Sequence, residues 1–339
     1  MKKLKFLFYP ILLICSIFLM QSCSNSDDEV IVPVDPTKPE TYRANVSFTT
    51  DASIGTKIKI GFSDKRIGQI IRVDWGDGKF VNEEIGNRTI IPGTTKGKTI
   101  RYYLSDIQEI SIYDSKITSI DLSQSPNLTK LDLVGNSLPS IDLSKTPLLK
   151  EVYLDENKLT KIDISNLSQL EDFSAMRNEL TTVDLTKNPQ LRYVSLGRNK
   201  LKTLDFTKNP KLTSIGFDFN EVTTVDLSQN LQLYGFDGSN NPLVSLDVTK
   251  NTKLLDLALS DTPITNIDLS KNQKLNQLEL SSKLFTPAKL LEIIKVLPTH
   301  KTDFKGTFIS YEEFQATTAV KTALRAKNWD MRLNTQIVN

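Results

Sequence analysis

Carboxylates are the side chains in this sequence whose spacing could support chemistry, and one set of them recurs at a fixed interval. An Asp flanked by apolar residues, as in the segment SIDLSKTP (140–147), returns with a constant 21-residue period. Regularly spaced carboxylates could form catalytic pairs, could hold calcium ions, or could belong to the scaffold. The eight members of this set are Asp121, Asp142, Asp163, Asp184, Asp205, Asp226, Asp247 and Asp268.

The residues that other catalytic mechanisms require are scarce. His300 is the only histidine, and the only two cysteines, Cys15 and Cys23, lie near the N-terminus. The sequence has neither a cluster of His and Cys with metal-ligand spacing nor a phosphate-binding Gly-Lys-Ser/Thr loop. A carboxylate pair of the kind that glycoside hydrolases use is therefore the one catalytic option left. We expect no metal site and no cofactor.

The Asp set is one column of a longer repeat. Leu recurs with the same 21-residue period from Leu128 to Leu275, with Ile107 one period earlier, and Asn stands at the eighth position after it in six of the units. The unit reads L-x-x-L-x-L-x-x-N-x-L-x-x-I-D-L-S/T and keeps its register for eight periods without an insertion. The six Asn residues are Asn136, Asn157, Asn178, Asn199, Asn220 and Asn241.

This unit resembles the consensus of leucine-rich repeat proteins over residues 107–282. The resemblance implies short parallel strands that stack into a solenoid of eight to nine coils. It also implies that the Asn side chains lie inside the turn and hydrogen-bond the backbone of neighbouring coils. The expected fold class is an α/β-type repeat solenoid that is mainly β with short turns.

The register predicts a scaffold role for the Asp column. In SIDLS the Ile and Leu alternate with Asp, so the Asp points outward from an extended segment on the side of the coil opposite the strand. Ser or Thr stands two residues after every Asp, a pattern typical of a turn in which the Asp accepts backbone N–H groups. A calcium-loaded column is the alternative, but calcium-binding repeats place glycines beside their Asp, and IDLSKTP has none.

The opposite, concave face carries the residues expected to bind a ligand. In this repeat class the exposed strand positions are the second, fourth, sixth and seventh after the first Leu. Between residues 107 and 282 these positions hold twelve acidic and three basic residues, a formal balance of −9. A surface of one sign attracts a basic partner, and aromatic side chains beside charges are typical anchors. The predicted ligand-binding set is Tyr113, Asp132, Tyr153, Asp155, Asp172, Met176, Arg177, Tyr193, Arg198 and Asp218.

The N-terminal residues predict an export signal. MKKLKF is basic, LFYPILLICSIFLM is apolar, and Cys23 follows a small residue, which resembles a bacterial lipobox with Cys23 acylated. The alternative is an ordinary signal peptide that leaves Cys23 free. SNSDDE after Cys23 resembles the surface-export signal of Bacteroidetes lipoproteins, although a short acidic run also suits a linker. Removal of residues 1–22 changes the formal charge from +2 to −1, which gives no reason to expect a nucleic-acid partner.

The segments that flank the repeat are predicted to cap the two ends of the solenoid. VDWGDG (73–78) lies among β-rich runs and resembles PKD-like β-sandwiches; Trp75 is expected in the core and Asp77-Gly78 in a hairpin turn. This small all-β domain is expected to cap the solenoid, with a recognition role as the alternative. After the repeat, Thr286 and Pro287 predict a helix start, and Ser310 with Glu313 predicts a second one through a capping box. ALRAKNWDMRL (323–333) resembles the tail of Bacteroidetes leucine-rich repeat proteins.

The expected organisation has five parts. They are a lipoprotein signal peptide (1–22), an acylated Cys and extended tether (23–42), a small β domain (43–106), the solenoid (107–282) and a helical C-terminal cap (283–339). We expect an outer-membrane, surface-exposed lipoprotein, held to the membrane by its lipid alone, that binds a protein partner and, as second choice, a glycan. A glycan-active enzyme using a pair such as Asp155 and Asp172, and a purely structural envelope component, are the alternatives.

Overall fold

A computed structural model describes residues 46–61, 69–85, 90–104, 107–280, 284–301, 305–310, 317–333 and 336–337. All of them belong to one compact unit, Tyr42–Asn339. The predicted signal peptide, Cys23 and tether lie outside the described residues. No helix in the described part of the chain has both the length and the apolar character to cross a bilayer.

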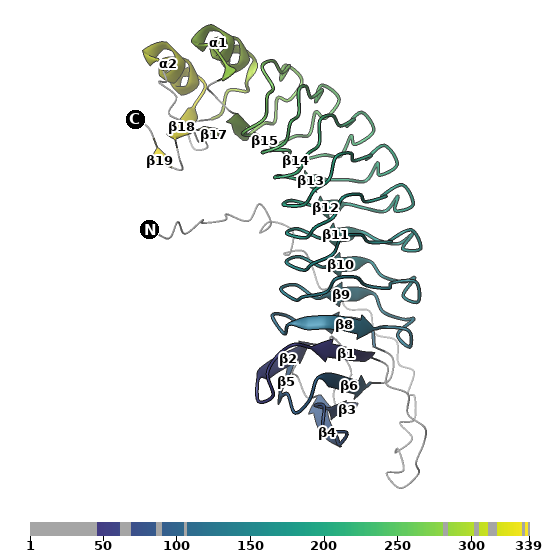
Figure 1. Cartoon of the computed structure of the whole chain (residues 1–339). Coiled ribbons are helices and arrows are strands. Elements are labelled where there is room, and N and C mark those ends of the chain that lie inside the picture. Colours follow the sequence, from purple (N-terminus) through teal and green to yellow (C-terminus); the bar gives the residue numbers. More distant parts are fainter. Residues whose placement is uncertain are drawn as a thin grey trace, which may run out of the picture. The chain divides into compact units, whose positions relative to one another are not determined.

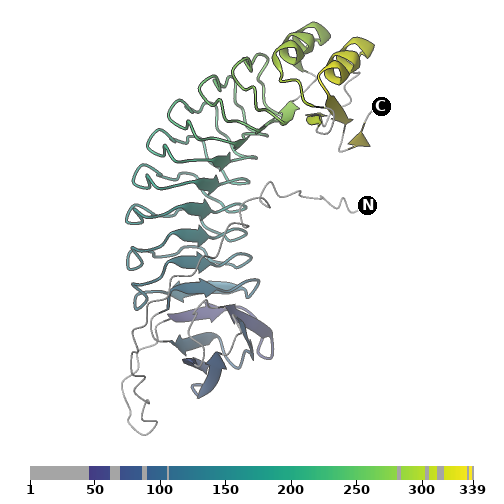
Figure 2. The ribbon, with the colours of Figure 1, turned by 180° about the vertical axis from the view of Figure 1, so that it is seen from behind.

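The repeat forms a ladder of short parallel strands, one per coil (Figures 1 and 2). Each strand pairs in register with the equivalent strand of the adjacent coil, so Val152 lies between Leu131 and Phe173. The ladder comprises β7 (Glu109–Ser111), β9 (Lys130–Asp132), β10 (Glu151–Tyr153), β11 (Asp172–Ser174), β12 (Tyr193–Ser195), β13 (Ser214–Gly216), β14 (Gly235–Asp237), β15 (Asp256–Leu259) and β16 (Gln277–Leu280).

Alternation along each strand builds the core. In the coil that contains β10, Leu149, Val152, Leu154 and Leu159 are all 0% exposed, whereas Tyr153 points outward and is half-buried. Successive side chains of a strand point to opposite faces, so the apolar residues stack upon those of the coils above and below. The predicted solenoid of parallel strands is confirmed.

The Asn column hydrogen-bonds adjacent coils, as expected. Asn157 Nδ2 donates to the carbonyl of Leu133 in the preceding coil at 2.9 Å and to that of Leu154 in its own coil at 3.1 Å. Its Oδ1 accepts the N–H of Leu138 at 3.0 Å. These buried amides satisfy backbone groups that a turn would otherwise leave unpaired.

A second Asn column was not anticipated. Asn209 Nδ2 donates to the carbonyls of Leu185 and Asn188, both at 2.9 Å, so this column also links adjacent coils on the far side of the core. Its members are at most 1% exposed. The 21-residue recurrence of Asn in segments such as TKNP was the signal that could have revealed it. The members are Asn188, Asn209, Asn230, Asn251 and Asn272.

The Asp column forms turns, which confirms its scaffold role. Asp184 Oδ1 accepts the backbone N–H of Thr186 at 2.8 Å and its hydroxyl at 2.7 Å. All eight members accept the N–H of the Ser or Thr two residues later, at 2.8–2.9 Å. Hydrogen bonds from that residue's hydroxyl and backbone lower the pKa of the carboxyl in Asp184 and Asp247, among others.

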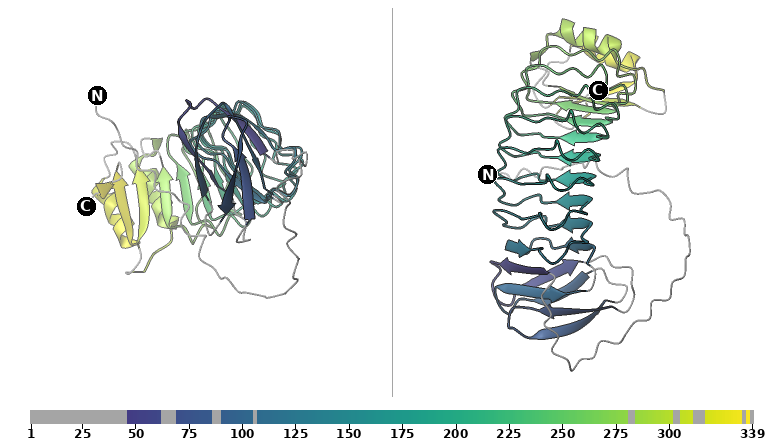
Figure 3. Two further views of the ribbon diagram at one scale, coloured as in Figure 1. Left: turned by 90° about the horizontal axis from the view of Figure 1, so that it is seen from below. Right: turned by 90° about the vertical axis from the view of Figure 1, so that its right-hand side faces the viewer.

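The strands before the repeat are antiparallel and continue into it through two sheets (Figure 3). In one sheet β1 pairs with β8, the outer segment of the first coil, and in the other β2 pairs with β7. The strands before the repeat are β1 (Val46–Thr50), β2 (Lys57–Gly61), β3 (Gln69–Asp74), β4 (Phe80–Ile85), β5 (Ile90–Thr94) and β6 (Thr99–Tyr103), and β8 (Ile117–Asp121) belongs to the first coil.

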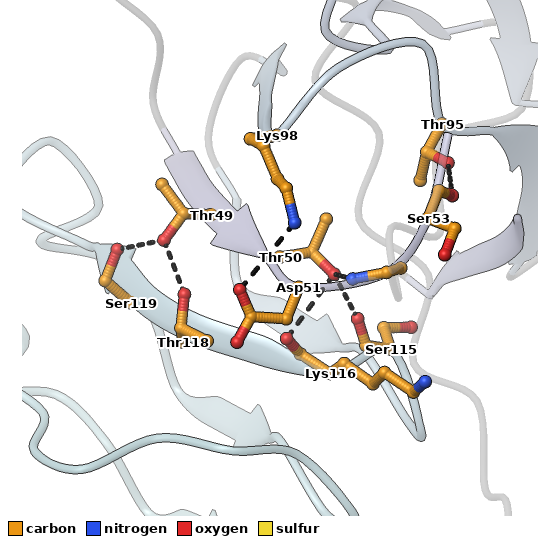
Figure 4. Close-up of polar contacts among 11 residues, drawn as sticks. Thr49, Thr50, Asp51, Ser53, Thr95, Lys98, Ser115, Lys116, Thr118 and Ser119 are labelled. Carbon is orange, nitrogen blue, oxygen red and sulfur yellow. Dashed lines mark hydrogen bonds and ion pairs between the residues drawn. The ribbon is translucent and has the colours of Figure 1, made fainter. Parts of the chain in front are cut away.

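Polar contacts join the strands before the repeat to its first coil (Figure 4). Thr50 Oγ1 donates to the Ser115 carbonyl at 2.6 Å and accepts the N–H of Ala52 at 2.9 Å. Thr50 is 1% exposed, so its hydroxyl supplies the hydrogen bonds that water would otherwise make to the Ser115 carbonyl and the Ala52 N–H.

The predicted environment of Trp75 is confirmed. It is 5% exposed, and its ring would lie 2.0 Å from a Cβ on Gly93, so this contact requires glycine. In the turn that follows, Asp74 Oδ1 accepts the N–H groups of Gly76 and Gly78 at 2.8 and 2.9 Å. Both glycines have positive φ, which suits the tight hairpin.

The segment after the repeat mixes helices and strands. It comprises α1 (Pro287–Val296), β17 (Gly306–Ser310), α2 (Thr318–Ala326), β18 (Trp329–Leu333) and β19 (Gln336–Ile337). Thr286 caps α1 as predicted, accepting the N–H of Lys289. The predicted helix start at Ser310 is wrong, because Ser310 ends β17, which extends the parallel ladder beyond β16. Thr317 caps α2 instead.

Candidate functional site

The candidate surface is the strand face, which we define as the outward side chains at the second, fourth, sixth and seventh positions after the first apolar residue of each coil. The strands lie along one side of the stack and the turns along the other (Figure 1). Of the ten predicted ligand-binding residues, Tyr113 and Arg177 are exposed and the other eight are half-buried. The strand face is therefore more shielded than the sequence pattern predicted, because long side chains of one coil cover those of the next.

The face over β9 and β10 is internally paired. Lys130 Nζ lies 2.6 Å from Glu151 Oε2 and 5.4 Å from the centre of the Tyr153 ring. Tyr113 donates from its hydroxyl to Asp132 Oδ2 at 2.8 Å. Because Tyr153 is also paired with Asp132 in the strand register, three predicted residues lie together, but their contacts occupy part of the hydrogen-bonding capacity offered to a ligand.

Asp155 hydrogen-bonds the next coil. Its Oδ1 accepts the Ser174 hydroxyl and the backbone N–H of Met176, both at 2.6 Å. Burial raises the pKa of Asp155, and these two hydrogen bonds oppose the shift. Asp172, its predicted partner in a catalytic pair, lies beside Tyr193 in the strand register. Burial followed by the charge of Glu151 raises the pKa of Asp172.

The last position of the strand face adopts left-handed backbone in every coil from Asp114 to Asp261. Four successive coils hold long or bulky side chains there, with φ of 52–58°: Glu156, Arg177, Arg198 and Phe219. Glycine or Asn would be less strained. The Arg177 guanidinium lies 3.5 Å from Glu156, and that of Arg198 lies 4.0 Å from the centre of the Phe219 ring.

The face over β13–β16 differs from the face over β9 and β10 in its ion pairs. Among the described residues, no ion pair joins Asp218, Asp237, Asp256 or Glu279 to a basic side chain. Burial, and then the charge of Asp237, raise the pKa of Asp218 to about 6, although Arg198 opposes the shift. Burial raises the pKa of Glu279 to about 7; the Ser260 hydroxyl opposes this shift and the charge of Asp237 adds to it.

These shifts predict a pH-dependent difference between the wild-type protein and Glu279→Gln. The folded-state pKa of Glu279 lies above its unfolded value of 4.5, so the ionised group destabilises the fold above about pH 7 and ceases to do so below 4.5. Glu279→Gln should therefore gain unfolding free energy over wild type on going from pH 5 to pH 8, by on the order of 2 kcal/mol. Urea unfolding at fixed ionic strength measures the difference.

The outer Asp column and His300 are common to both proteins, so their titration cancels. Asp184 and Asp247 of that column have lowered folded pKa values, so their contribution to stability is present above pH 3.8 and is lost only at lower pH. A constant difference between the two proteins from pH 5 to 8 would show that Glu279 is not desolvated.

Asp237 and Glu279 are two of the twelve acidic residues of the strand face, but they are not in the predicted ligand-binding set. The signal that distinguishes them is the residue type of their neighbours. Gly216 and Ala258 flank Asp237 in the strand register, where the earlier coils carry Tyr153 and Ser174. Small neighbours supply neither a hydrogen bond nor a counter-charge.

Comparison with known proteins finds similarity to solved structures only. No family model matches the sequence, and no curated protein matches it. Similar solved structures include a leucine-rich repeat protein of Leptospira interrogans (18% identity, 65% of this chain and 64% of that one, TM-score 0.44). Internalin C2 of Listeria monocytogenes is 22% identical over 51% of this chain and 80% of its own, with TM-score 0.44.

The functional domain of InlJ from Listeria monocytogenes is 27% identical, with TM-score 0.34. That match covers 52% of this chain and 48% of the InlJ chain, so it spans about half of each.

Proposed function

We propose that this chain is a non-catalytic binding protein that recognises a basic protein partner through its strand face. The observation that carries the proposal is the charge of that face: twelve acidic residues against three basic ones, in a chain whose formal charge is +2. Such a field steers a basic partner toward the face and disfavours acidic ones. A regular row of strands also suits binding better than hydrolysis, which needs a cleft around a carboxylate pair.

The left-handed positions support the same proposal. Residues held in strained backbone cluster at functional sites. Glu156, Arg177, Arg198 and Phe219 form a continuous strip along one edge of the strand face. Phe219 is 42% exposed, which makes it an anchor available to a partner.

A glycan is the second candidate ligand. Tyr113 is 45% exposed on the same face, beside the carboxylate of Asp132, to which its hydroxyl donates. Exposed aromatic rings next to hydrogen-bonding carboxylates can stack on sugar rings and bind their hydroxyls. A glycan ligand would be less sensitive to salt than a basic protein.

The proposed setting is the outer surface of a bacterial outer membrane. Cys23 would carry the lipid, residues 24–42 would form the tether, and the β strands before the repeat would cap the first coil and hold it away from the membrane. This setting rests on the N-terminal sequence. Labelling of cells with radioactive palmitate, with Cys23→Ser as the control, tests it.

Binding arrays test the function. The protein from Cys23 onward, without its lipid, is presented to protein and glycan arrays at about 0.05 and 0.5 M NaCl. These ionic strengths lie below and above the physiological value of about 0.15 M. We expect capture of basic proteins that weakens about tenfold or more at high salt, and is weakened further by combining Asp132→Asn, Asp155→Asn and Asp172→Asn. Binding that neither salt nor this triple variant changes would contradict the proposal.

A further inference from the structure

Small residues line the strand face over β13–β15, and one of them leaves open space. A Cβ built on Gly216 would have no atom within 4 Å, and one on Gly235 would meet only Ser214 Oγ at 3.5 Å. Gly216 and Ala258 lie on either side of Asp237 in the register. The open space at Gly216 is therefore adjacent to Asp237 in the strand register.

Carboxylates surround this space. Glu279 follows Ala258 in the register, and Asp218 is two residues after Gly216 on the same face. The charges of Asp237, Asp261 and Asp218 each act on Glu279. In the earlier coils two of the strand-face acids have basic partners, Lys130 for Glu151 and Arg177 for Glu156. In the described part of the chain, no such ion pair reaches Asp218, Asp237 or Glu279.

Asp237 accepts the backbone N–H of Ser239 at 3.0 Å, but a buried hydroxyl at the same place lacks a partner. Ser260 is 4% exposed, and its Oγ makes no hydrogen bond of acceptable geometry with any described residue. It nevertheless lies close enough to the Glu279 carboxylate to lower its pKa. A buried polar atom without a partner is costly. Because its neighbours here are carboxylate acceptors, a donor-rich cation would satisfy all of them.

We propose that the segment formed by Gly216, Asp237, Ser260 and Glu279 binds the cationic end of a Lys or Arg side chain from the protein partner. The aliphatic stem lies over Gly216, and the charged end donates to Asp237, Glu279 and the Ser260 hydroxyl. A metal ion fits less well, because no group of three or more potential ligands in the described residues is close enough to hold one. This inference rests on the proposed function and locates its charged anchor.

A matched peptide pair tests the site. The probes are the fluorescent peptides (Gly-Ser-Lys)3 and (Gly-Ser-norleucine)3, titrated with the protein from Cys23 onward at low salt and pH 7.5. We expect the lysine peptide to bind at least about tenfold more tightly. Glu279→Gln and Asp237→Asn should each weaken it about fivefold or more, and Gly216→Leu should do the same by filling the space without changing charge.

Asp163→Asn, which removes the same charge from the outer side of the coil, is the control and should leave the affinity unchanged. Circular dichroism verifies that Gly216→Leu is folded, and Glu279→Gln tests the site independently of it. The inference is overturned if the two peptides bind equally, or if the lysine peptide is insensitive to Glu279→Gln and Gly216→Leu. Basic proteins still captured on the array in a salt-dependent way would then leave the proposed function standing.

Discussion

Replacement of Asn178 by Ala is expected to lower the free energy of unfolding by about 3 kcal/mol or more, because it leaves several buried backbone groups unpaired. Asn178 Nδ2 donates to the carbonyls of Leu154 and Ala175 at 2.9 and 3.2 Å, and its Oδ1 accepts the N–H of Leu159 at 2.9 Å. Alanine replaces none of these bonds. Urea unfolding followed by circular dichroism measures the loss.

Thr181→Ala is the control for Asn178. Thr181 is exposed in the same coil, and its truncation should change the free energy of unfolding by less than about 0.5 kcal/mol. Equal effects of the two substitutions would contradict the view that the Asn column joins the coils.

Replacement of Phe217 by Ala should cost about 3–5 kcal/mol of unfolding free energy, the range for a large aromatic removed from a core. Phe217 is 0% exposed, and its ring centre lies 5.5 Å from that of Phe236 in the next coil and 6.2 Å from that of Phe206. The cavity would lie between adjacent coils, whose contacts supply much of a solenoid's stability. Urea unfolding measures this loss of unfolding free energy, through the shift of the midpoint.

Phe219→Ala is a closely matched control. It removes the same side chain two residues later, from a position that is 42% exposed, so a loss below about 1 kcal/mol is expected. Its effect should appear in partner binding instead, since Phe219 belongs to the strip along the edge of the strand face. If Phe219→Ala destabilised the fold as much as Phe217→Ala, Phe219 would be a core residue and could not serve as an anchor.

Features that depend on one coil and its neighbour could be predicted from the sequence. The strand positions, the inward apolar residues, the Asn column and the outer Asp turns all follow from a 21-residue register that never shifts. Asp184 illustrates this, because its hydrogen-bond partner Thr186 is two residues away. The second Asn column could have been read from the same register.

Features that depend on distant pairing could not be predicted in this way. Ser310 and Glu313 match a capping box, yet Ser310 lies in β17 because that strand pairs with β16. Likewise, the outer segment of the first coil becomes strand β8 because β1 lies beside it. In both places tertiary strand pairing outweighs a local preference.

The candidate site was predicted as a set of positions but not as an electrostatic surface. Whether an acid is neutralised depends on the residue one coil away: Glu151 has Lys130, whereas Asp237 has Gly216 and Ala258. The desolvation that raises the pKa of Asp218 and Glu279 depends on the packing of several coils together. The acids most available to a cation therefore lie further along the solenoid than the sequence alone indicated.

Carboxylate footprinting tests the central claim, that a basic partner binds the strand face, most directly. Solvent-accessible Asp and Glu are coupled to an amine by a carbodiimide, with and without a partner captured on the array, and each site is quantified by mass spectrometry. The outer Asp column, such as Asp163 and Asp184, serves as the internal reference. We predict protection of Asp218, Asp256 and Glu279 with no change in the outer column. Protection of the outer column, with the strand-face acids labelled as in the free protein, would contradict the account.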